Sequence, residues 1–458
     1  MSKNPIPENG IHDARQLGTP RMLVLGIQHM FAMFGATVLV PVLTGLSVSA
    51  TLLFAGLGTL LFHLLAKGKV PAFLGSSFAF IGGYAAIAPL LPDAAGEFTV
   101  PNTELLPYAC FGVACAGLLY AVLAALFKAF GTKKVMRFFP PIVTGPVIIC
   151  IGLSLSSSAI NNCQSNWLIA LVAIVVVVAA NIWGKGMVKI IPILLGVLAS
   201  YIVAAVTGNV DFTAVKDAAW LGLPFRWGNT VFGLFSRDNL DVSLLITSAI
   251  TIMPLALATM VEHIGDMCAI SSTCGKNFLA DPGFHRTLLG DGLATTLASL
   301  FGAPANTTYG ENTGVLALSK VYDPKVVRIA AYLAILFAFC PKFEALIAAM
   351  PAATIGGVSM ILYGMISAVG VRNVVENKVD FTKSRNVLIA ALIMVLSIGI
   401  TYSAAGAVAI PVGSVTIKLS GLAVGAIAGI VLNAVLPGKD YEFGADDQGD
   451  KSVNFIVQ

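Results

Sequence analysis

Apolar runs of about 17–25 residues recur along the whole chain, and each is long enough to cross the hydrocarbon core of a bilayer as a helix. Only 11% of the residues are charged, while 57% are hydrophobic. A soluble domain of this length carries roughly twice that charged fraction. The sequence therefore predicts an all-α polytopic membrane protein.

Short connections join the apolar segments, except for a polar stretch at 208–242. The polar N-terminus is longer than the start of a signal peptide, and no small-residue cleavage site follows the first run, so we interpret that run as a retained span. The predicted segments number fourteen: 22–44, 49–66, 71–91, 107–128, 138–157, 166–184, 187–207, 243–263, 286–302, 304–319, 326–349, 351–371, 386–404 and 413–437.

The loop charges support an even number of segments. With the N-terminus inside, 22 of the 27 Lys and Arg residues fall on the inside connections. Positively charged loops favour the cytoplasmic side. Both termini are therefore predicted to be cytoplasmic. The five basic residues that fall outside are Lys216, Arg226, Arg237, Lys342 and Lys418.

Short internal sequence similarities relate segment n to segment n+7. Gln28-His29 resembles Glu262-His263, and the run from Ser76 to Phe78 resembles the run from Thr307 to Tyr309. Pro140 and Gly145 are echoed by Pro351 and Gly356 in the same order. Because seven is odd, the two halves enter the membrane from opposite sides. The sequence predicts a 7+7 inverted repeat, an architecture common among secondary transporters.

The third and tenth segments are interrupted in the same way, since they open 71-PAFLGSSFAFIGG-83 and 304-PANTTYGENTG-314. Each has Pro, then a small hydroxyl pair, then an aromatic residue, then Gly. Hydroxyl and aromatic residues suit strands, and non-helical backbone at this depth is tolerated where it lines a cavity or is buried in protein. Short antiparallel strands that lead into half-helices are predicted here; a packed re-entrant turn is the alternative.

Carboxylates inside the spans are few, which makes them candidate ligands and proton carriers. Glu262 and Asp266 are four residues apart and share a helical face, and Glu311 follows the aromatic residue of segment ten. A charged side chain at a helix centre costs about 2.5–3.5 kcal/mol on insertion scales. Asp266 could instead bond a nearby backbone or hydroxyl group, and Asp291 is expected to be structural.

Two other polar side chains in apolar segments have a functional and a structural interpretation. His29 could brace Glu262, or it could be a buried histidine whose hydrogen bonds serve only the packing of the core. Tyr363 could face the site from the opposite side or serve packing. No phosphate-binding loop, zinc-protease motif or GxSxG hydrolase motif occurs. Asp266 and the histidines could ligate a metal on paper, but no cysteine joins them at ligand spacing.

Six stretches carry a resemblance to a known family: 27-IQHMFAMFGATVLVP-41, 69-KVPAFLGSSFAFI-81, 261-VEHIGD-266, 281-DPGFHR-286, 302-GAPANTTYGENTGVLALSK-320 and 356-GGVSMILYG-364. On these residues the chain resembles the nucleobase–ascorbate transporter family, most closely its bacterial uracil permeases. The signature in segment ten is the most specific, and it ends in Ser319-Lys320 where Thr is usual at the first position.

The resemblance implies a core domain and a gate domain, a homodimer, and proton-coupled uptake across the bacterial inner membrane. The core is expected at 22–135 and 243–349, and the gate at 136–208 and 350–438. An external loop is expected at 209–242, with cytoplasmic tails at 1–21 and 439–458.

The resemblance also implies roles for individual residues. Substrate contacts fall on the side chains of Glu262 and Glu311 and on the backbone amides of Phe78 and Gly310. A proton-linked position falls on Asp266, where the uracil permease pattern has histidine and many purine carriers have aspartate. Ser359 and Tyr363 fall on the wall formed by the gate domain.

Uracil fits these groups because it has two N–H donors and two carbonyl acceptors on a flat ring. Carboxylates accept from N–H groups, and backbone amides donate to carbonyls. The side chains of Phe78 and Tyr309 are expected to cover a ring face, and Glu262, Asp266, Glu311 and His29 are the expected proton-coupling residues.

The expected activity is therefore proton symport of a nucleobase, with uracil as the favoured substrate and a xanthine, urate or guanine carrier as the alternative. No cofactor other than the coupled proton is expected, and the expected partners are the nucleobase, lipid and a second copy of the chain, without nucleic acid. A channel and an intramembrane enzyme are competing hypotheses, and no catalytic motif supports the enzyme.

Overall fold

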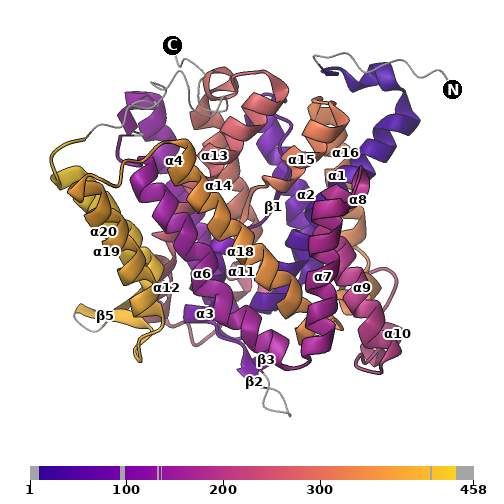
Figure 1. Ribbon diagram of the computed structural model, residues 1–458. Helices are drawn as coiled ribbons and strands as arrows, with labels where there is room; N and C mark the ends of the chain where they lie inside the picture. The colour runs from indigo at the N-terminus through magenta and orange to yellow at the C-terminus, as the bar shows by residue number, and fades with distance from the viewer. Residues whose placement is uncertain (1–9, 93–97, 132–133, 136, 413–414, 440–458) are drawn as a thin grey trace.

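The computed structural model describes residues 10–92, 98–131, 134–135, 137–412 and 415–439. Most helices run roughly side by side, and the first helix starts at the same face of the molecule at which the last helix ends (Figure 1). The predicted tail at 440–458 and residues 1–9 lie outside the described part of the chain.

Long apolar helices dominate the described chain, and seven of them can cross a membrane by length and composition. An eighth span results if the two halves of a bent pair, α16 (Pro324–Ala338) and α17 (Pro341–Ala348), are counted together. The seven are α1 (Thr19–Thr44), α2 (Val48–Leu65), α4 (Leu106–Phe130), α6 (Pro141–Gln164), α12 and α13 together (Val242–Cys274), α18 (Ala352–Glu376) and α19 (Ser384–Thr401). The chain is a multi-pass membrane protein, as the sequence predicts.

Shorter helices fill the rest of the bundle and its loops, and each predicted apolar segment contains helix. The number of fourteen membrane crossings remains a prediction. The shorter apolar helices are η2 with α3 (Phe78–Ile87), α7 (Trp167–Trp183), α9 (Pro192–Val206) and α20 (Gly421–Val435). The others are η1 (Ala14–Leu17), α8 (Met187–Ile190), α10 (Thr213–Asp217), η3 (Trp227–Asn229), α11 (Val231–Leu234), η4 (Leu279–Gly283), α14 (Phe284–Leu300) and α15 (Glu311–Ser319).

Two predicted helical segments are wrong in extent. Segment eight was expected to end at 263, but α13 continues to Cys274, because its polar residues contact the neighbouring β4 and α15 instead of leaving the bundle. Segment eleven was expected to be one run, but α16 and α17 meet at 87°. Pro341 begins α17 and explains the break, since proline has no backbone donor and disfavours helix at the residue before it.

Short strands occur where they were predicted in segments three and ten. β1 (Leu74–Ser76) and β4 (Asn306–Thr308) pair antiparallel, with Gly75 opposite Thr307. Two further pairs were not predicted: β2 (Leu91–Pro92) with β3 (Phe98–Val100), and the hairpin of β5 (Ala407–Val412) and β6 (Val415–Ser420). Segment fourteen therefore begins as a strand, and its helix starts only at Gly421.

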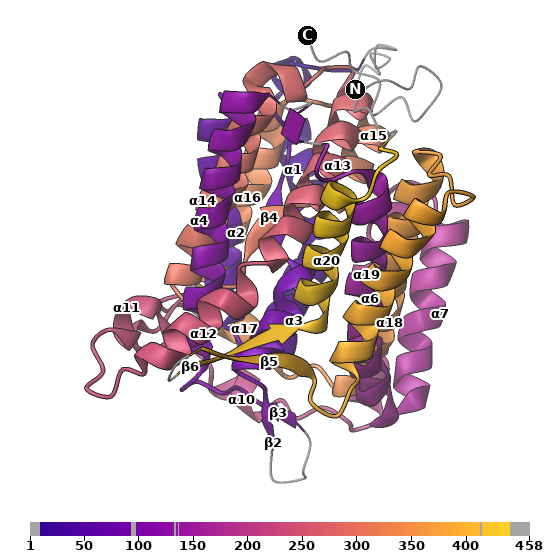
Figure 2. The ribbon, with the colours of Figure 1, turned by 90° about the vertical axis from the view of Figure 1, so that its left-hand side faces the viewer.

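The helices pack in two groups, which Figure 2 shows on opposite sides of the molecule. In the first group α4 packs on α14, and α2 lies against both α14 and α16. In the second, α6 packs on α18 and α19, while α7 packs on α9 and α18. Glycines allow the closest approaches: a Cβ on Gly117 would lie 2.7 Å from the carbonyl oxygen of Gly292, and the reverse distance is the same. The predicted core and gate ranges follow the same grouping and remain a prediction.

Candidate functional site

The crossing of β1 and β4 places two helix starts close together inside the bundle. Helix η2 starts at Phe78, two residues after β1, and α15 starts at Glu311, three residues after β4. The first N–H groups of a helix have no acceptor within that helix, and they carry the positive end of its dipole. The crossing therefore offers hydrogen-bond donors and positive potential in a buried position.

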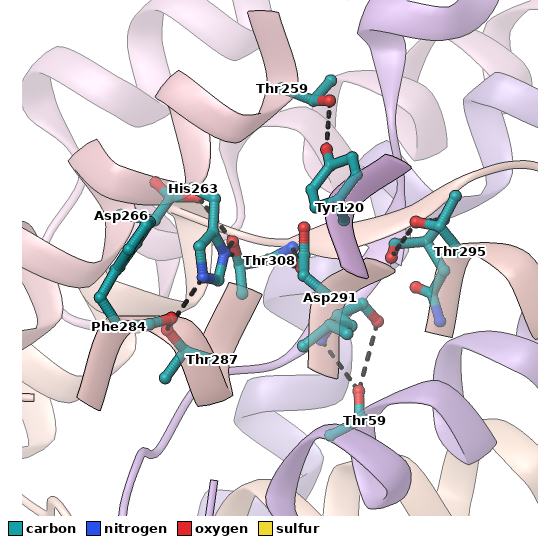
Figure 3. Close-up of polar contacts among 12 residues, drawn as sticks. Thr59, Tyr120, Thr259, His263, Asp266, Phe284, Thr287, Asp291, Thr295 and Thr308 are labelled. Carbon is teal, nitrogen blue, oxygen red and sulfur yellow. Dashed lines mark hydrogen bonds and ion pairs between the residues drawn. The ribbon is translucent and has the colours of Figure 1, made fainter. Parts of the chain in front are cut away.

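A threonine from a neighbouring helix holds each strand. The Thr59 hydroxyl of α2 accepts from Leu74 N at 2.9 Å and lies 3.4 Å from Leu74 O. In the other half, the Thr295 hydroxyl of α14 donates to Asn306 O at 2.8 Å and accepts from Asn306 N at 3.2 Å (Figure 3). One hydroxyl thus hydrogen-bonds both the N–H and the C=O of a strand residue. Leaving these backbone groups unpaired in a membrane would be costly.

Neither threonine was singled out from the sequence. A hydroxyl residue in the middle of an apolar helix is the only available signal, and many such residues merely bond their own helix.

Tyr309 ties the two strands together. Its hydroxyl donates to the carbonyl oxygen of Ser76 at 2.7 Å and lies 3.4 Å from the Thr37 hydroxyl. Its backbone N donates to Phe73 O at 2.9 Å, and the side chain is buried. The ring packs against Gly75, where an added Cβ would lie 2.6 Å from two ring atoms. The predicted role of Tyr309 over a substrate ring remains a prediction, and the contacts seen here fasten β4 to β1.

Helix α13 brings its carboxylates to the start of α15. Glu262 is exposed and Asp266 half-buried, one turn apart on the helix. The Thr308 hydroxyl lies 3.3 Å from Asp266 Oδ2. A Cβ on Gly310 would lie 2.9 Å from Asp266 Oδ1, so the missing side chain lets the carboxylate approach the backbone. The backbone of Glu311 begins α15, but its side chain lies outside the described part of the structure.

A chain of hydrogen bonds leads away from Asp266 (Figure 3). His263 Nδ1 lies 3.0 Å from the Thr308 hydroxyl, and its Nε2 lies 3.2 Å from the Thr287 hydroxyl. The Thr287 hydroxyl donates to Phe284 O at 3.0 Å. Thr287 thus accepts from His263 Nε2–H, which leaves Nδ1 as an acceptor. The single Thr308 proton must then serve either His263 or Asp266.

Asp291 also contacts β4, and its expected structural role remains a prediction. It is fully buried on α14, and its Oδ1 accepts from Thr308 N at 2.8 Å. This bond fixes the end of β4 beside Asp266.

His29 on α1 meets α15 through Asn312. The Asn312 amide Nδ2 lies 3.1 Å from His29 Nδ1 and donates to His29 O at 3.1 Å. The amide nitrogen has two protons, so it supplies both contacts, and Nδ1 is an acceptor. The proton of neutral His29 then lies on Nε2, which is buried and has no hydrogen-bond partner in the described structure. That His29 braces Glu262 remains a prediction.

The second helix group reaches the site through α18. The Tyr363 ring meets the Phe78 ring edge-on, with centroids 6.2 Å apart. The hydroxyls of Tyr363, Ser359 and Ser77 are buried, and none of them has a hydrogen-bond partner among the described residues. Buried polar groups normally have partners, so these donors, together with His29 Nε2, fit a site for a polar ligand or water.

A helical membrane bundle with crossed half-helices facing intramembrane carboxylates has the architecture of a secondary transporter. The model of the family described as "Permease family" matches residues 20–406, and the chain belongs to that family. The uracil permease of Bacillus subtilis (strain 168) is 38% identical over 437 residues, 92% of this chain and 94% of that protein. The uracil permease of Bacillus caldolyticus is 39% identical and covers 94% of this chain and 95% of its own length.

The fold is also similar to a solved structure. The transmembrane domain of a cyanobacterial bicarbonate transporter, BicA, superposes with a TM-score of 0.57 at 15% identity. The superposition covers 93% of this chain and 99% of that one. The fold is therefore one used by membrane transporters, and the family resemblance seen in the sequence is confirmed.

Proposed function

We propose that this protein imports a nucleobase, uracil first, across the bacterial inner membrane together with protons. The observation that carries the proposal is the meeting of the starts of η2 and α15 with the carboxylate face of α13. The names of the two Bacillus relatives, both uracil permeases, support the choice of substrate.

Uracil recognition would use both kinds of group at the strand crossing. The carboxylates of Glu262 and Glu311 accept from the two ring N–H groups, while the backbone amides of Phe78 and Gly310 donate to the two carbonyls. The Phe78 ring, which Tyr363 meets edge-on from the opposite helix group, would cover one face of the uracil ring. The unpartnered His29 Nε2–H is a further donor for a carbonyl or carboxylate.

Proton coupling would act through Asp266. When Asp266 is protonated, its O–H donates to the Thr308 hydroxyl, which is then free to donate to His263 Nδ1, so every contact in the chain is satisfied. When Asp266 is ionised, it takes the Thr308 proton and the bond to His263 is lost. A proton on Asp266 therefore tightens the packing of β4 on α13, and by linkage a ligand that needs this arrangement favours protonation.

The packing of the helices supports the 7+7 inverted repeat. Exchanging each segment n with its counterpart n+7 converts the contact of α4 with α14 into that of α16 with α2, and both contacts occur. The same exchange relates the contact of α19 with α20 to that of α7 with α9, and it maps the β1–β4 pair onto itself. Alternating access would then be a movement of the core group, which holds the site, against the gate group.

Other parts of the proposal rest on the sequence. The distribution of basic residues places both termini in the cytoplasm, and a homodimer follows from the family resemblance. Permease relatives fit a transporter, not an enzyme. A purine carrier is the alternative within the class, because Asp266 replaces a histidine; a channel is a more distant alternative.

Uptake into proteoliposomes tests the proposal. Radiolabelled uracil should accumulate when the external solution is acidic, and a protonophore should abolish the accumulation. Excess xanthine that leaves uptake unchanged supports uracil symport, whereas complete competition by xanthine moves the substrate to a purine. Voltage-driven currents far above carrier rates would instead support a channel.

Substitutions separate the roles of the carboxylates. Glu262→Ala should abolish transport and Glu311→Gln should abolish or severely reduce uracil binding, while the exposed Glu104→Gln serves as a matched control. Asp266→Asn should impair proton-driven accumulation more than binding. Equal loss of both in Asp266→Asn would make it a ligand or structural residue, and wild-type uptake in the two glutamate variants would refute the site.

A further inference from the structure

A pocket of about 560 Å³ lies between the loop after α2, the loop after α13 and the start of α16. Pockets of this size hold small organic ligands. It is separate from the strand crossing, and the transport proposal does not use it.

Four cations and two carboxylates line the pocket, and both carboxylates are already paired. Asp281 pairs with Lys69, and Asp323 lies 3.5 Å from Lys325 Nζ. Asp323 also accepts from the backbone N of Ala14 at 2.8 Å and caps α16. The remaining two cations are Lys276 and Arg328. The pocket therefore keeps two positive charges for which it supplies no counter-charge.

Arg328 is held in a fixed orientation. Its Nε lies 3.3 Å from His63 Nδ1, and His63 Nε2 lies 2.9 Å from the carbonyl oxygen of Ala72. Since the carbonyl accepts from Nε2–H, Nδ1 accepts from Arg328. A Cβ on Gly68, which has a φ of 65°, would lie 2.8 Å from a terminal nitrogen of Arg328. Among the described residues, the terminal nitrogens have no hydrogen-bond acceptor and remain available to a ligand.

We propose that this pocket binds a phosphate monoester through Arg328 and Lys276. A phosphate monoester carries about −1.5 to −2 charges at pH 7 and three strong acceptor oxygens, which matches the two uncompensated cations. A guanidinium with two free nitrogens suits a pair of phosphate oxygens, and the flexible Lys276 ammonium adds a point charge. The phosphate could belong to a small cytoplasmic metabolite or to an anionic lipid headgroup.

The position of the pocket gives the ligand a structural effect. Lys276 lies two residues beyond the end of α13, and Arg328 lies in the helix that follows α15 after a short connection. A phosphate bound between them joins the end of α13, which carries Glu262 and Asp266, to α16, the helix that follows α15. The ligand is therefore expected to stabilise the core group.

Equilibrium dialysis of the purified full chain in detergent with radiolabelled glycerol 3-phosphate tests the site. Lys276→Gln and Arg328→Gln should each weaken binding by about tenfold or more, as expected for loss of a charge-assisted hydrogen bond. Lys189→Gln is the matched control, because it removes an exposed lysine outside the pocket. Lys276 is exposed and makes no side-chain hydrogen bond or ion pair among the described residues, so its variant tests the site even if loss of Arg328 destabilises the fold.

No binding up to about 10 mM ligand in the wild type, or equal weakening in Lys189→Gln, would overturn the proposal. A second arm repeats the measurement in nanodiscs of phosphatidylcholine with and without phosphatidic acid. Loss of glycerol 3-phosphate binding only with phosphatidic acid identifies the lipid headgroup as the source, and unchanged binding identifies a free metabolite. Either result supports a phosphate site.

Discussion

The contact between Asn312 and His29 is the link between α15 and α1 that can be broken with one small change. Asn312→Leu keeps the approximate side-chain volume and removes both hydrogen bonds of the amide nitrogen, to His29 Nδ1 and to His29 O. A typical intramolecular hydrogen bond contributes about 1 kcal/mol net, so the loss is about 2 kcal/mol. If uracil binding requires both hydrogen bonds, this loss lowers the affinity for uracil by up to about 30-fold.

The same substitution also frees the tautomer of His29. Without a donor at Nδ1, the proton is no longer confined to Nε2, and the donor that we propose for the ligand is only partly populated. Binding of radiolabelled uracil to purified protein, measured by scintillation proximity, should weaken by about 10–30-fold. Proton-driven uptake at saturating uracil should fall less, because the substitution leaves the α13 carboxylates in place.

Asn433→Leu is the control for a general loss of stability. Asn433 is buried on α20, and its amide donates to the backbone carbonyls of Arg137 and Phe138 at 3.1 and 3.4 Å. Its Oδ1 also accepts from Arg385 at 2.6 Å, so Asn433→Leu should lower the melting temperature at least as much as Asn312→Leu while leaving uracil affinity unchanged. An Asn312→Leu protein that melts below wild type and binds uracil within about twofold of wild type would refute the reasoning.

Two further predictions concern the strand crossing and the pocket. Gly75→Ala should destabilise the protein by about 1–3 kcal/mol and abolish uracil binding, because the new Cβ would lie 2.6 Å from the Tyr309 ring, whereas Gly82→Ala, with nothing within 4 Å, should melt and bind like wild type. The hydrogen bond from Lys69 lowers the pKa of Asp281 below its ordinary value. That pair therefore stabilises the fold above about pH 4 and is lost as the pH falls through the lowered pKa, so the melting temperatures of wild type and Asp281→Asn should differ slightly at pH 7 and converge in acid.

The strands at the centre of the fold were predictable because their local chemistry is unusual. Pro71 and Pro304 each precede a hydroxyl pair and an aromatic residue inside an otherwise apolar segment, and this pattern favours extended backbone over helix. The charges of α13 were also visible, since a carboxylate within a span needs a function or a partner. These signals lie within one segment each and need no knowledge of which segments touch.

Features that depend on contacts between distant segments could not be predicted. The bonds of Thr59 and Thr295 to the strands join different helices, and nothing in the local sequence separates these threonines from others. The β5–β6 hairpin was hidden because its alternating residues continue an apolar run. The contacts of Tyr309 were hidden for a similar reason, since an aromatic residue beside a site can face the ligand or the protein.

The hydrogen bonds around β1 and β4 also bear on how the site could open alternately to the two sides. Thr59 on α2 and Thr295 and Asp291 on α14 belong to the first helix group, and each hydrogen-bonds a residue of β1 or β4. Tyr309 follows β4 and bonds Ser76 of β1, so this group and the strands themselves hold the crossing. A site fixed in this way is not readily opened by unfolding the strands, because several buried backbone groups would lose partners at once. Phe78 and Tyr363 meet through ring edges, so motion at this one contact breaks no hydrogen bond, whereas the bonds from Tyr201 to Leu346 O and from Thr251 to Lys418 O lie elsewhere between the predicted gate and core ranges. The movement that exposes the site is therefore expected along α18.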